Sequence, residues 1–109
     1  MTRRLPPALA ASATPRILEL LGDPPARVLE LGFGGIHAVP LRLAGFEVVV
    51  VEPDPALRER ASQRAGAALD AIPDEPFDAV IAPEGAEVPE APAVIRVGHD
   101  GSTWRSTST

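Results

Sequence analysis

The stretch RVLELGFGGIHAVPLRLAGFEVVVVEPD, residues 27–54, decides the fold of this 109-residue chain. It begins with an apolar run that ends at a glycine-rich turn, continues through a short helical pattern, and closes on four consecutive valines at 48–51. Unbroken apolar and β-branched runs of this kind are typical of parallel strands covered on both faces. Two such strands joined by a helix form a right-handed βαβ unit. We therefore predict an α/β fold, a Rossmann-like three-layer sandwich with a small, mostly parallel sheet.

The residues on both sides continue this alternation. Thr14 and Asp54 each precede a proline, which is the pattern of a helix N-cap followed by proline at the first helical position. Gly22 and Gly66 supply the corresponding helix ends. Residues 77–82, FDAVIA, form a third apolar strand.

Three finer expectations concern the connections. The helix after the glycine turn should begin near Ile36, so that Pro40 falls in its first turn. Residues 67–71 leave room for only a short or irregular strand. The arginines on the helix after Asp54 alternate with an acidic residue and are expected to form a solvated face. These arginines are Arg58, Arg60 and Arg64.

The domain organisation follows from composition. Residues 1–13 contain adjacent prolines and are expected to be a disordered leader. Residues 14–82 form the Rossmann-like core. Residues 83–92, PEGAEVPEAP, are acidic and proline-rich and indicate an exposed loop. Residues 93–109 predict a C-terminal β-hairpin with a frayed tail, because an Asp-Gly turn separates two short strand patterns.

Composition limits the possible functions. The net charge of -5 argues against the usual basic nucleic-acid-binding surface. The absence of cysteine removes thiolate metal sites and cysteine nucleophiles, and the two histidines are far apart in sequence, so no metal site is expected. No segment approaches the ~20 apolar residues of a membrane span. We expect a cytoplasmic protein without membrane or nucleic-acid partners.

The glycine turn and two acidic residues predict a nucleoside-containing ligand. A glycine-rich turn between a strand and a helix lets a ligand approach the main chain at the carboxyl end of the strand. Glu52 ends the next strand about 20 residues further on, where a carboxylate accepts hydrogen bonds from a ribose diol. Glu30 lies two positions before the first glycine and suits a cationic partner such as an amino group. Gly32 and Gly34 also fit the dinucleotide fingerprint, but His37 stands where its third glycine is needed.

These motifs resemble class I S-adenosylmethionine-dependent methyltransferases. VLELGFGG at 28–35 is similar to their first motif, VVVVEPDPALRERA at 48–61 to their second strand and following helix, and FDAVIA at 77–82 to their fourth strand. The resemblance implies S-adenosylmethionine as cofactor, with Glu30 near its methionine end, Glu52 on the ribose hydroxyls and Pro53 against the adenine. The cofactor-binding residues that we expect are Glu30, Gly32, Phe33, Gly34, Gly35, Glu52 and Pro53.

The chain departs from that family in several places. Ile36 replaces a usual glycine and is expected to narrow the cofactor cleft. Ala67 or Ala68 stands where an aspartate usually meets the adenine amine, and Asp70 is a substitute if the loop is displaced by a couple of residues. APEG at 82–85 replaces the Asn-Pro-Pro-aromatic tetrad of many nitrogen methyltransferases. Only one candidate hairpin follows where the family has three more strands, so the expected fold is a truncated form of the family's.

Three functional hypotheses stay open. The first is a methyltransferase-like protein that binds S-adenosylmethionine and transfers a methyl group to an unknown acceptor, with no catalytic base nominated. The alternative is a non-catalytic relic whose C-terminal strands and Trp104 form a homodimer or partner interface. Nicotinamide dinucleotide binding is a third. His37 is expected to face solvent, His99 to be exposed beside a turn, and Trp104 either to anchor a partner or to cover a thin edge of the core.

Overall fold

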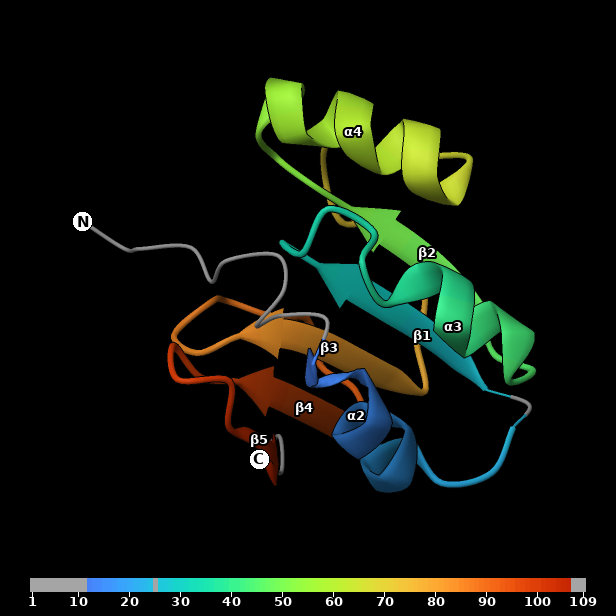
Figure 1. Ribbon diagram of the computed structural model, residues 1–109, viewed down its shortest axis with the longest axis vertical. Helices are drawn as coiled ribbons and strands as arrows, with labels where there is room; N and C mark the ends of the chain where they lie inside the picture. Colours follow the sequence, from blue (N-terminus) through green and yellow to red (C-terminus); the bar gives the residue numbers. More distant parts are fainter. Residues whose placement is uncertain (1–11, 25, 107–109) are drawn as a thin grey trace.

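A computed structural model describes residues 12–24 and 26–106, and these residues form the predicted α/β fold (Figure 1). The predicted leader and tail lie outside the described residues at 1–11 and 107–109. Ala13, which we assigned to the leader, is buried in the core at the start of the first described helix. The elements in chain order are α2 (Thr14–Leu21), β1 (Arg27–Leu31), α3 (Ala38–Leu43), β2 (Glu47–Val51), α4 (Pro55–Ala65), β3 (Ala79–Pro83), β4 (Ala93–Val97) and β5 (Thr103–Ser106).

The described strands form one five-stranded sheet with the order β2-β1-β3-β4-β5. β1 pairs in parallel with both β2 and β3, and β3 pairs in parallel with β4. β5 returns antiparallel to β4 and completes the predicted C-terminal hairpin. The chain thus runs outward from β1 to β2 and then crosses back to β3 on the other side of β1. In open α/β sheets, ligands bind where the strand order reverses in this way, beyond the carboxyl ends of the strands.

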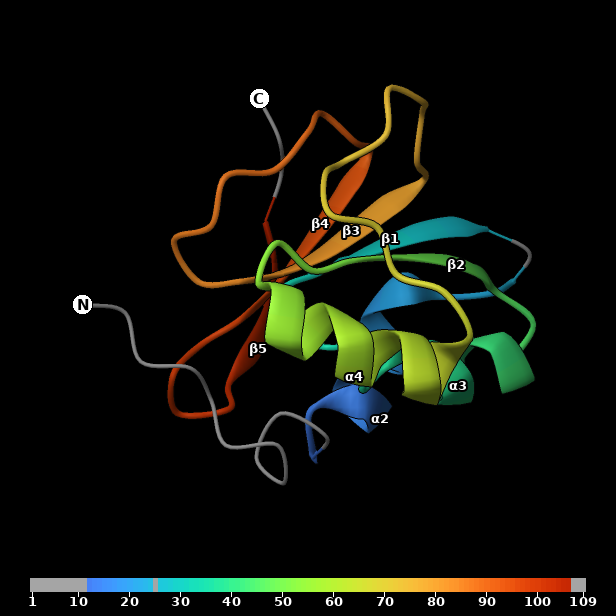
Figure 2. The same ribbon diagram turned by 90° about the horizontal axis from the view of Figure 1, so that it is seen from above.

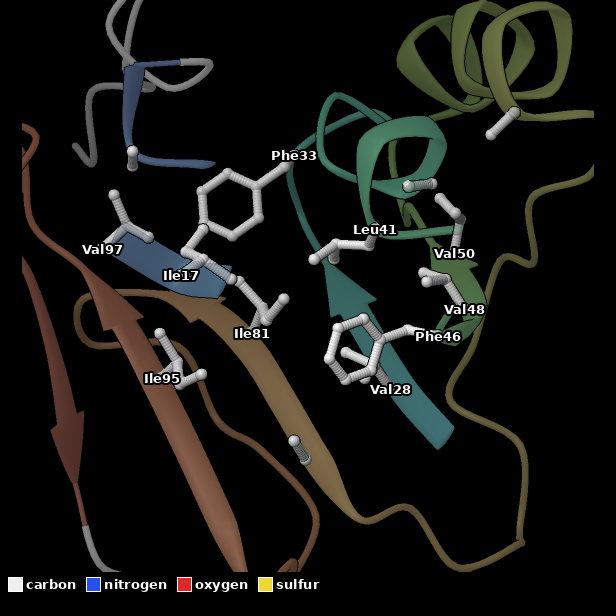
Figure 3. Packing of buried hydrophobic residues seen from close by; sticks show 14 of the residues in the cluster. Ile17, Val28, Phe33, Leu41, Phe46, Val48, Val50, Ile81, Ile95 and Val97 are labelled. Carbon is white, nitrogen blue, oxygen red and sulfur yellow. The ribbon is translucent and has the colours of Figure 1, made fainter. Parts of the chain in front are cut away.

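The two faces of the sheet are covered differently. The described helices α2, α3 and α4 lie on one face, and the long loops before and after β3 lie on the other (Figure 2). Figure 3 shows the helix-side core, where Ile17 of α2 lies in one cluster with Phe33, Ile81 and Ile95. The second face buries alternate strand residues under the loop at 84–92. These buried strand residues include Leu29, Leu31, Val51, Val80 and Ala82.

Gly22 and Gly66 end α2 and α4 as predicted, whereas the predicted helix starts agree with the structure in one case and differ in two. Asp54 caps α4 as predicted, because its carboxylate accepts hydrogen bonds from the amides of Ala56 and Leu57 at 3.0 and 3.2 Å. The predicted hydroxyl cap at Thr14 is wrong: Thr14 is the first residue of α2, and its side chain caps no amide. α3 begins at Ala38, two residues after the predicted start at Ile36, because two consecutive glycines at positive φ keep the preceding turn out of the helical conformation. Pro40 falls in the first turn of α3, as predicted.

The segment between α4 and β3 forms an irregular edge in place of a full strand. Leu69 makes an isolated parallel bridge to Val51 of β2. Its amide donates to the Val50 carbonyl, and its carbonyl accepts from the Glu52 amide, both at 2.9 Å. Further along the same edge, the Arg42 guanidinium donates to the Val48 carbonyl at 2.8 Å. An arginine side chain and a single bridge therefore satisfy carbonyls that a neighbouring strand would otherwise pair.

Candidate functional site

A pocket of about 760 Å³ lies beyond the carboxyl ends of the strands, at the reversal of strand order beside β1. This volume is within the range of small-molecule and cofactor sites. Its wall comes from the glycine turn, α4, the loop after the Leu69 bridge, the turn after β3 and the end of β4. The lining residues are Leu31, Gly32, Phe33, Gly34, Ile36, Val51, Pro53, Leu57, Arg60, Arg64, Asp70, Ala71, Ile72, Pro83, Glu84, Gly85, Ala86, Glu87, Val97 and His99.

The predicted cofactor residues divide between the pocket wall and the layer behind it. Those in the wall are Gly32, Phe33, Gly34 and Pro53. The other three, Glu30, Gly35 and Glu52, are buried and do not line the pocket. The structure therefore brings the glycine turn and the end of β2 to one pocket, while two of the predicted carboxylates lie beneath its surface.

The glycine turn is closely packed against its neighbours. Gly32 has a φ of 81°, and a Cβ atom added there would lie 3.3 Å from Pro83 Cγ. Gly35 has a φ of 77°, and an added Cβ would lie 3.2 Å from the Cβ of Ala65 on α4. Both positions combine a backbone conformation that favours glycine with too little space for a side chain. The turn consequently fits tightly between α4 and the end of β3.

Glu30 supports the turn from below. Its side chain has no exposed surface, and its carboxylate accepts a hydrogen bond from the His37 amide at 2.8 Å. Burial raises the pKa of Glu30 to about 7, against the opposing effect of hydrogen bonds from the His37 and Gly35 amides and of the charges on Arg42 and Arg64. Close to neutral pH, Glu30 is thus divided between its charged and neutral forms.

His37 corrects the sequence interpretation. We expected a solvent-facing histidine at a helix start, but His37 is fully buried. Its Nδ1 lies 2.8 Å from Thr14 Oγ1, and its ring meets the Phe33 ring edge-on at a centroid distance of 5.0 Å. Burial lowers the pKa of His37 to about 4, so the imidazole is neutral at physiological pH. The glycine turn reverses the chain before α3 and directs this side chain into the helix-side core.

Glu52 and Pro53 end β2 beside the pocket. Glu52 has no exposed surface, and its carboxylate accepts from the Asp54 amide at 3.3 Å. Pro53 is exposed and lies in the pocket wall. Arg58 holds this corner from α4 by donating to the carbonyls of Glu52 and Pro53 at 3.3 and 3.2 Å.

Two arginines of the pocket were missed by sequence reasoning. Arg60 and Arg64 are exposed, as expected, but both belong to the pocket wall. Arg64 also donates to the Gly34 carbonyl at 2.8 Å and so connects α4 to the glycine turn. Their spacing of four residues places them on the same side of α4. This spacing was the available signal, but the mixed charges around it are equally typical of a solvated face.

Asp70 and the turn after β3 add carboxylates to the wall. Asp70 directly follows the bridge at Leu69 and lines the pocket. The sequence offered Asp70 as a substitute for the aspartate that is missing at 67 or 68. Glu84, Glu87 and His99 complete this side, and His99 is exposed as expected. No group of three or more metal-ligating side chains gathers among the described residues.

Trp104 lies on the edge strand β5, with 38% of its surface exposed. Its ring covers Gly98, where an added Cβ would lie 3.2 Å from Trp104 Cζ3. Part of the Trp104 side chain is therefore exposed to solvent, and part packs against Gly98 directly after β4. Of the described helices, none has the length and apolar character to cross a membrane.

Among solved structures, the chain is similar to a TehB-like SAM-dependent methyltransferase from Corynebacterium glutamicum. The identity is 24% over 68% of this chain and 48% of that chain, with a TM-score of 0.48. The chain thus matches about half the length of that protein. No protein-family model and no curated protein matches the sequence. The chemistry of the site therefore rests on this chain's own residues.

Proposed function

We propose that the protein binds S-adenosylmethionine in the pocket at the end of β1 and transfers its methyl group to an acceptor that is still unidentified. One observation carries the proposal: the glycine turn, Pro53 and Asp70 come from three separate segments and line one pocket at the reversal of strand order. Nucleoside ligands occupy this position in open α/β sheets. The resemblance of residues 28–35, 48–61 and 77–82 to methyltransferase motifs favours this cofactor over other nucleosides.

The residues of the pocket fit a cationic nucleoside. Leu31, Ile72 and Leu57 offer apolar contacts for an adenine ring, while the three negative charges of Asp70, Glu84 and Glu87 exceed the two positive charges of Arg60 and Arg64 in the wall. His37 fills the space where a dinucleotide site needs its third glycine, and it is fully buried. These two features favour a sulfonium ligand and disfavour the pyrophosphate of a nicotinamide dinucleotide.

Each predicted site residue has a proposed role in binding the cofactor. Gly32, Phe33 and Gly34 provide the surface of the turn, and Pro53 and Asp70 hold the adenine. Glu52 is assigned to the ribose hydroxyls, which requires its carboxylate to turn from the Asp54 amide toward the pocket. Glu30 and Gly35 act from beneath, by shaping the turn.

The bound cofactor supplies an activated methyl group, so the protein's task is to position the acceptor in line with it and to exclude water. Glu84, Glu87 and His99 line the pocket from the segments that follow β3 and β4, and these side chains are proposed to contact the acceptor. No general base is assigned, because methyl transfer does not require one for every acceptor.

A non-catalytic binding module is the second candidate. β5 is the edge strand of the sheet, and Trp104 on it is 38% exposed. Tryptophan is enriched at the energetic centres of interfaces, and an open edge strand accepts another strand. In this case the C-terminal hairpin contacts a second copy or another protein, and the pocket serves no catalysis.

Isothermal calorimetry of the purified chain with S-adenosylmethionine, S-adenosylhomocysteine and NAD tests the proposal. We expect heat from the first two ligands and none from NAD. Asp70→Asn should weaken binding about tenfold, the loss of roughly 1.4 kcal/mol, whereas Asp74→Asn, on the same loop and outside the pocket wall, should bind like the wild type. Silence from all three ligands contradicts the proposal, and a dimer mass by light scattering then supports the binding module.

A further inference from the structure

A buried polar cluster beneath the glycine turn joins three elements that are distant in sequence. Thr14 comes from α2, Glu30 from β1 and His37 from the residue before α3. Glu30 and His37 have no exposed surface, and Thr14 is 8% exposed. None of the three lines the pocket. Buried polar groups are costly unless they form hydrogen bonds, so the bonds that join His37 to Glu30 and to Thr14 favour one relative position of the three elements.

His37 is the centre of this cluster. Its backbone amide donates to Glu30 at 2.8 Å, its Nδ1 lies at hydrogen-bond distance from Thr14 Oγ1, and its ring supports the edge of Phe33. Phe33 in turn lines the pocket. A continuous series of contacts therefore runs from Thr14 through His37 to a residue of the pocket wall.

The Thr14 end of this series belongs to a different part of the molecule. α2 packs against β4 and β5, near the edge of the sheet that is farthest from β2 (Figure 1). Ile17, one turn after Thr14, shares a cluster with Ile95 and Val97 of β4 (Figure 3). The position of α2 is therefore set by the C-terminal half of the sheet, while its first residue contacts the glycine turn.

We propose that Thr14 and His37 are positioning residues that hold Phe33 and the glycine turn in their binding form, so that ligand affinity depends on the docking of α2. The proposal rests on the proposed function for the identity of the ligand. Because the imidazole is neutral at physiological pH, the contact between Thr14 and His37 is a bond between uncharged groups and persists throughout the physiological range.

The test uses Thr14→Val, which removes the hydroxyl with little change of shape, and Thr14→Ser, which keeps it. Thr103→Val on β5 is the matched control, because Thr103 lies outside the pocket wall and the cluster. Val80→Ala controls for lost stability, because Val80 is buried on the face of the sheet opposite to α2 and does not line the pocket. Each variant is examined by chemical denaturation, by amide hydrogen exchange without ligand, and by S-adenosylhomocysteine titration.

We expect Thr14→Val to raise the exchange rates of the His37 and Ala38 amides at least fivefold more than its loss of global stability accounts for. We also expect it to weaken S-adenosylhomocysteine binding about tenfold. Thr14→Ser should restore both to within twofold of the wild type. Thr103→Val and Val80→Ala should leave both unchanged after correction for stability.

Unchanged exchange in Thr14→Val overturns the proposal, as does an equal change in Val80→Ala at matched stability. If the wild type does not bind S-adenosylhomocysteine, the proposed function fails, and the exchange comparison still decides whether Thr14 positions the turn.

Discussion

The wall of the pocket and the layer beneath the glycine turn contain similar ionisable side chains in opposite environments. In the wall, Asp70, Arg60 and Arg64 are exposed and face an open pocket. Beneath the turn, Glu30 and His37 have no exposed surface, and burial moves the pKa of Glu30 up to about 7 and that of His37 down to about 4. The wall is therefore suited to contact a ligand. The buried layer instead maintains the shape of the turn, and its titration makes the free energy of unfolding depend on pH.

This difference separates two kinds of mutational effect. A change in the buried layer removes interactions that the folded state needs, so it alters the free energy of unfolding first and binding as a consequence. A change at an exposed side chain of the wall leaves the fold intact and chiefly alters binding.

The largest expected effect is the pH dependence that Glu30 contributes to stability. The pKa of Glu30 is about 7 in the folded protein, above its ordinary value of 4.5, so the folded state binds the carboxyl proton more tightly than the unfolded state does. The stabilisation is fully present below pH 4.5 and is lost as the pH rises through about 7. Between these values the unfolding free energy of the wild type should fall by roughly 3 kcal/mol relative to Glu30→Gln. Urea denaturation of both proteins across this range measures the difference.

His37 contributes the opposite dependence. Its folded pKa of about 4 lies below its ordinary value of 6.5, so stability is lost as the pH falls from 6.5 to 4. The two effects largely cancel in the wild type, and Glu30→Gln should reveal the dependence of His37. Glu47→Gln, at the exposed start of β2, should retain the profile of the wild type. Parallel pH profiles for the wild type and Glu30→Gln would show that the two regions do not differ as described.

A smaller effect is expected at the glycines. Gly35→Ala places a Cβ 3.2 Å from Ala65 at a φ of 77°, whereas Gly66→Ala meets nothing within 4 Å at a φ of 88°. Gly66→Ala should cost about 1 kcal/mol from backbone conformation alone. Gly35→Ala should cost about 2 kcal/mol, because contact with α4 is added. Thermal denaturation compares them, and equal costs would mean that α4 adjusts freely to the turn.

The smallest effect on stability is expected in the wall. Arg64→Ala removes an exposed side chain that bonds the Gly34 carbonyl, so the unfolding free energy should change by less than about 1 kcal/mol. Binding of S-adenosylhomocysteine should weaken about threefold, because Gly34 loses a contact that fixes it. Arg16→Ala, in an exposed pair with Glu19 on α2, serves as the control and should alter neither quantity. A loss of stability much larger than in the control would place Arg64 with the buried layer.

Much of the fold was predictable because its signals are local. The four valines, the proline after Asp54 and the glycines that end helices each determine the conformation of a few neighbouring residues. These signals located the five strands and the end of α4 to within about two residues. Residues 67–71 were predicted to be short or irregular, and only Leu69 forms a bridge there.

The site was less predictable because it depends on contacts between distant segments. The burial of His37 follows from the path of the glycine turn and from Thr14, 23 residues earlier. Arg60 and Arg64 carry the same local pattern whether they face open solvent or a pocket. Asp70 reaches the pocket only because Leu69 pairs with β2. Each of these features depends on which segment is packed opposite, and local periodicity contains no information about that.

The most direct test of a cofactor site at the glycine turn is nuclear magnetic resonance of glycine-labelled protein titrated with S-adenosylhomocysteine. Nine glycines give few signals, and Gly32, Gly34 and Gly85 line the pocket while Gly22 and Gly45 come before β1 and β2, at the opposite end of the strands. We predict saturable shifts of the first three amides and none at the other two. Saturable binding that leaves the signals of Gly32 and Gly34 unchanged, or no binding at all, would contradict a cofactor site at the glycine turn.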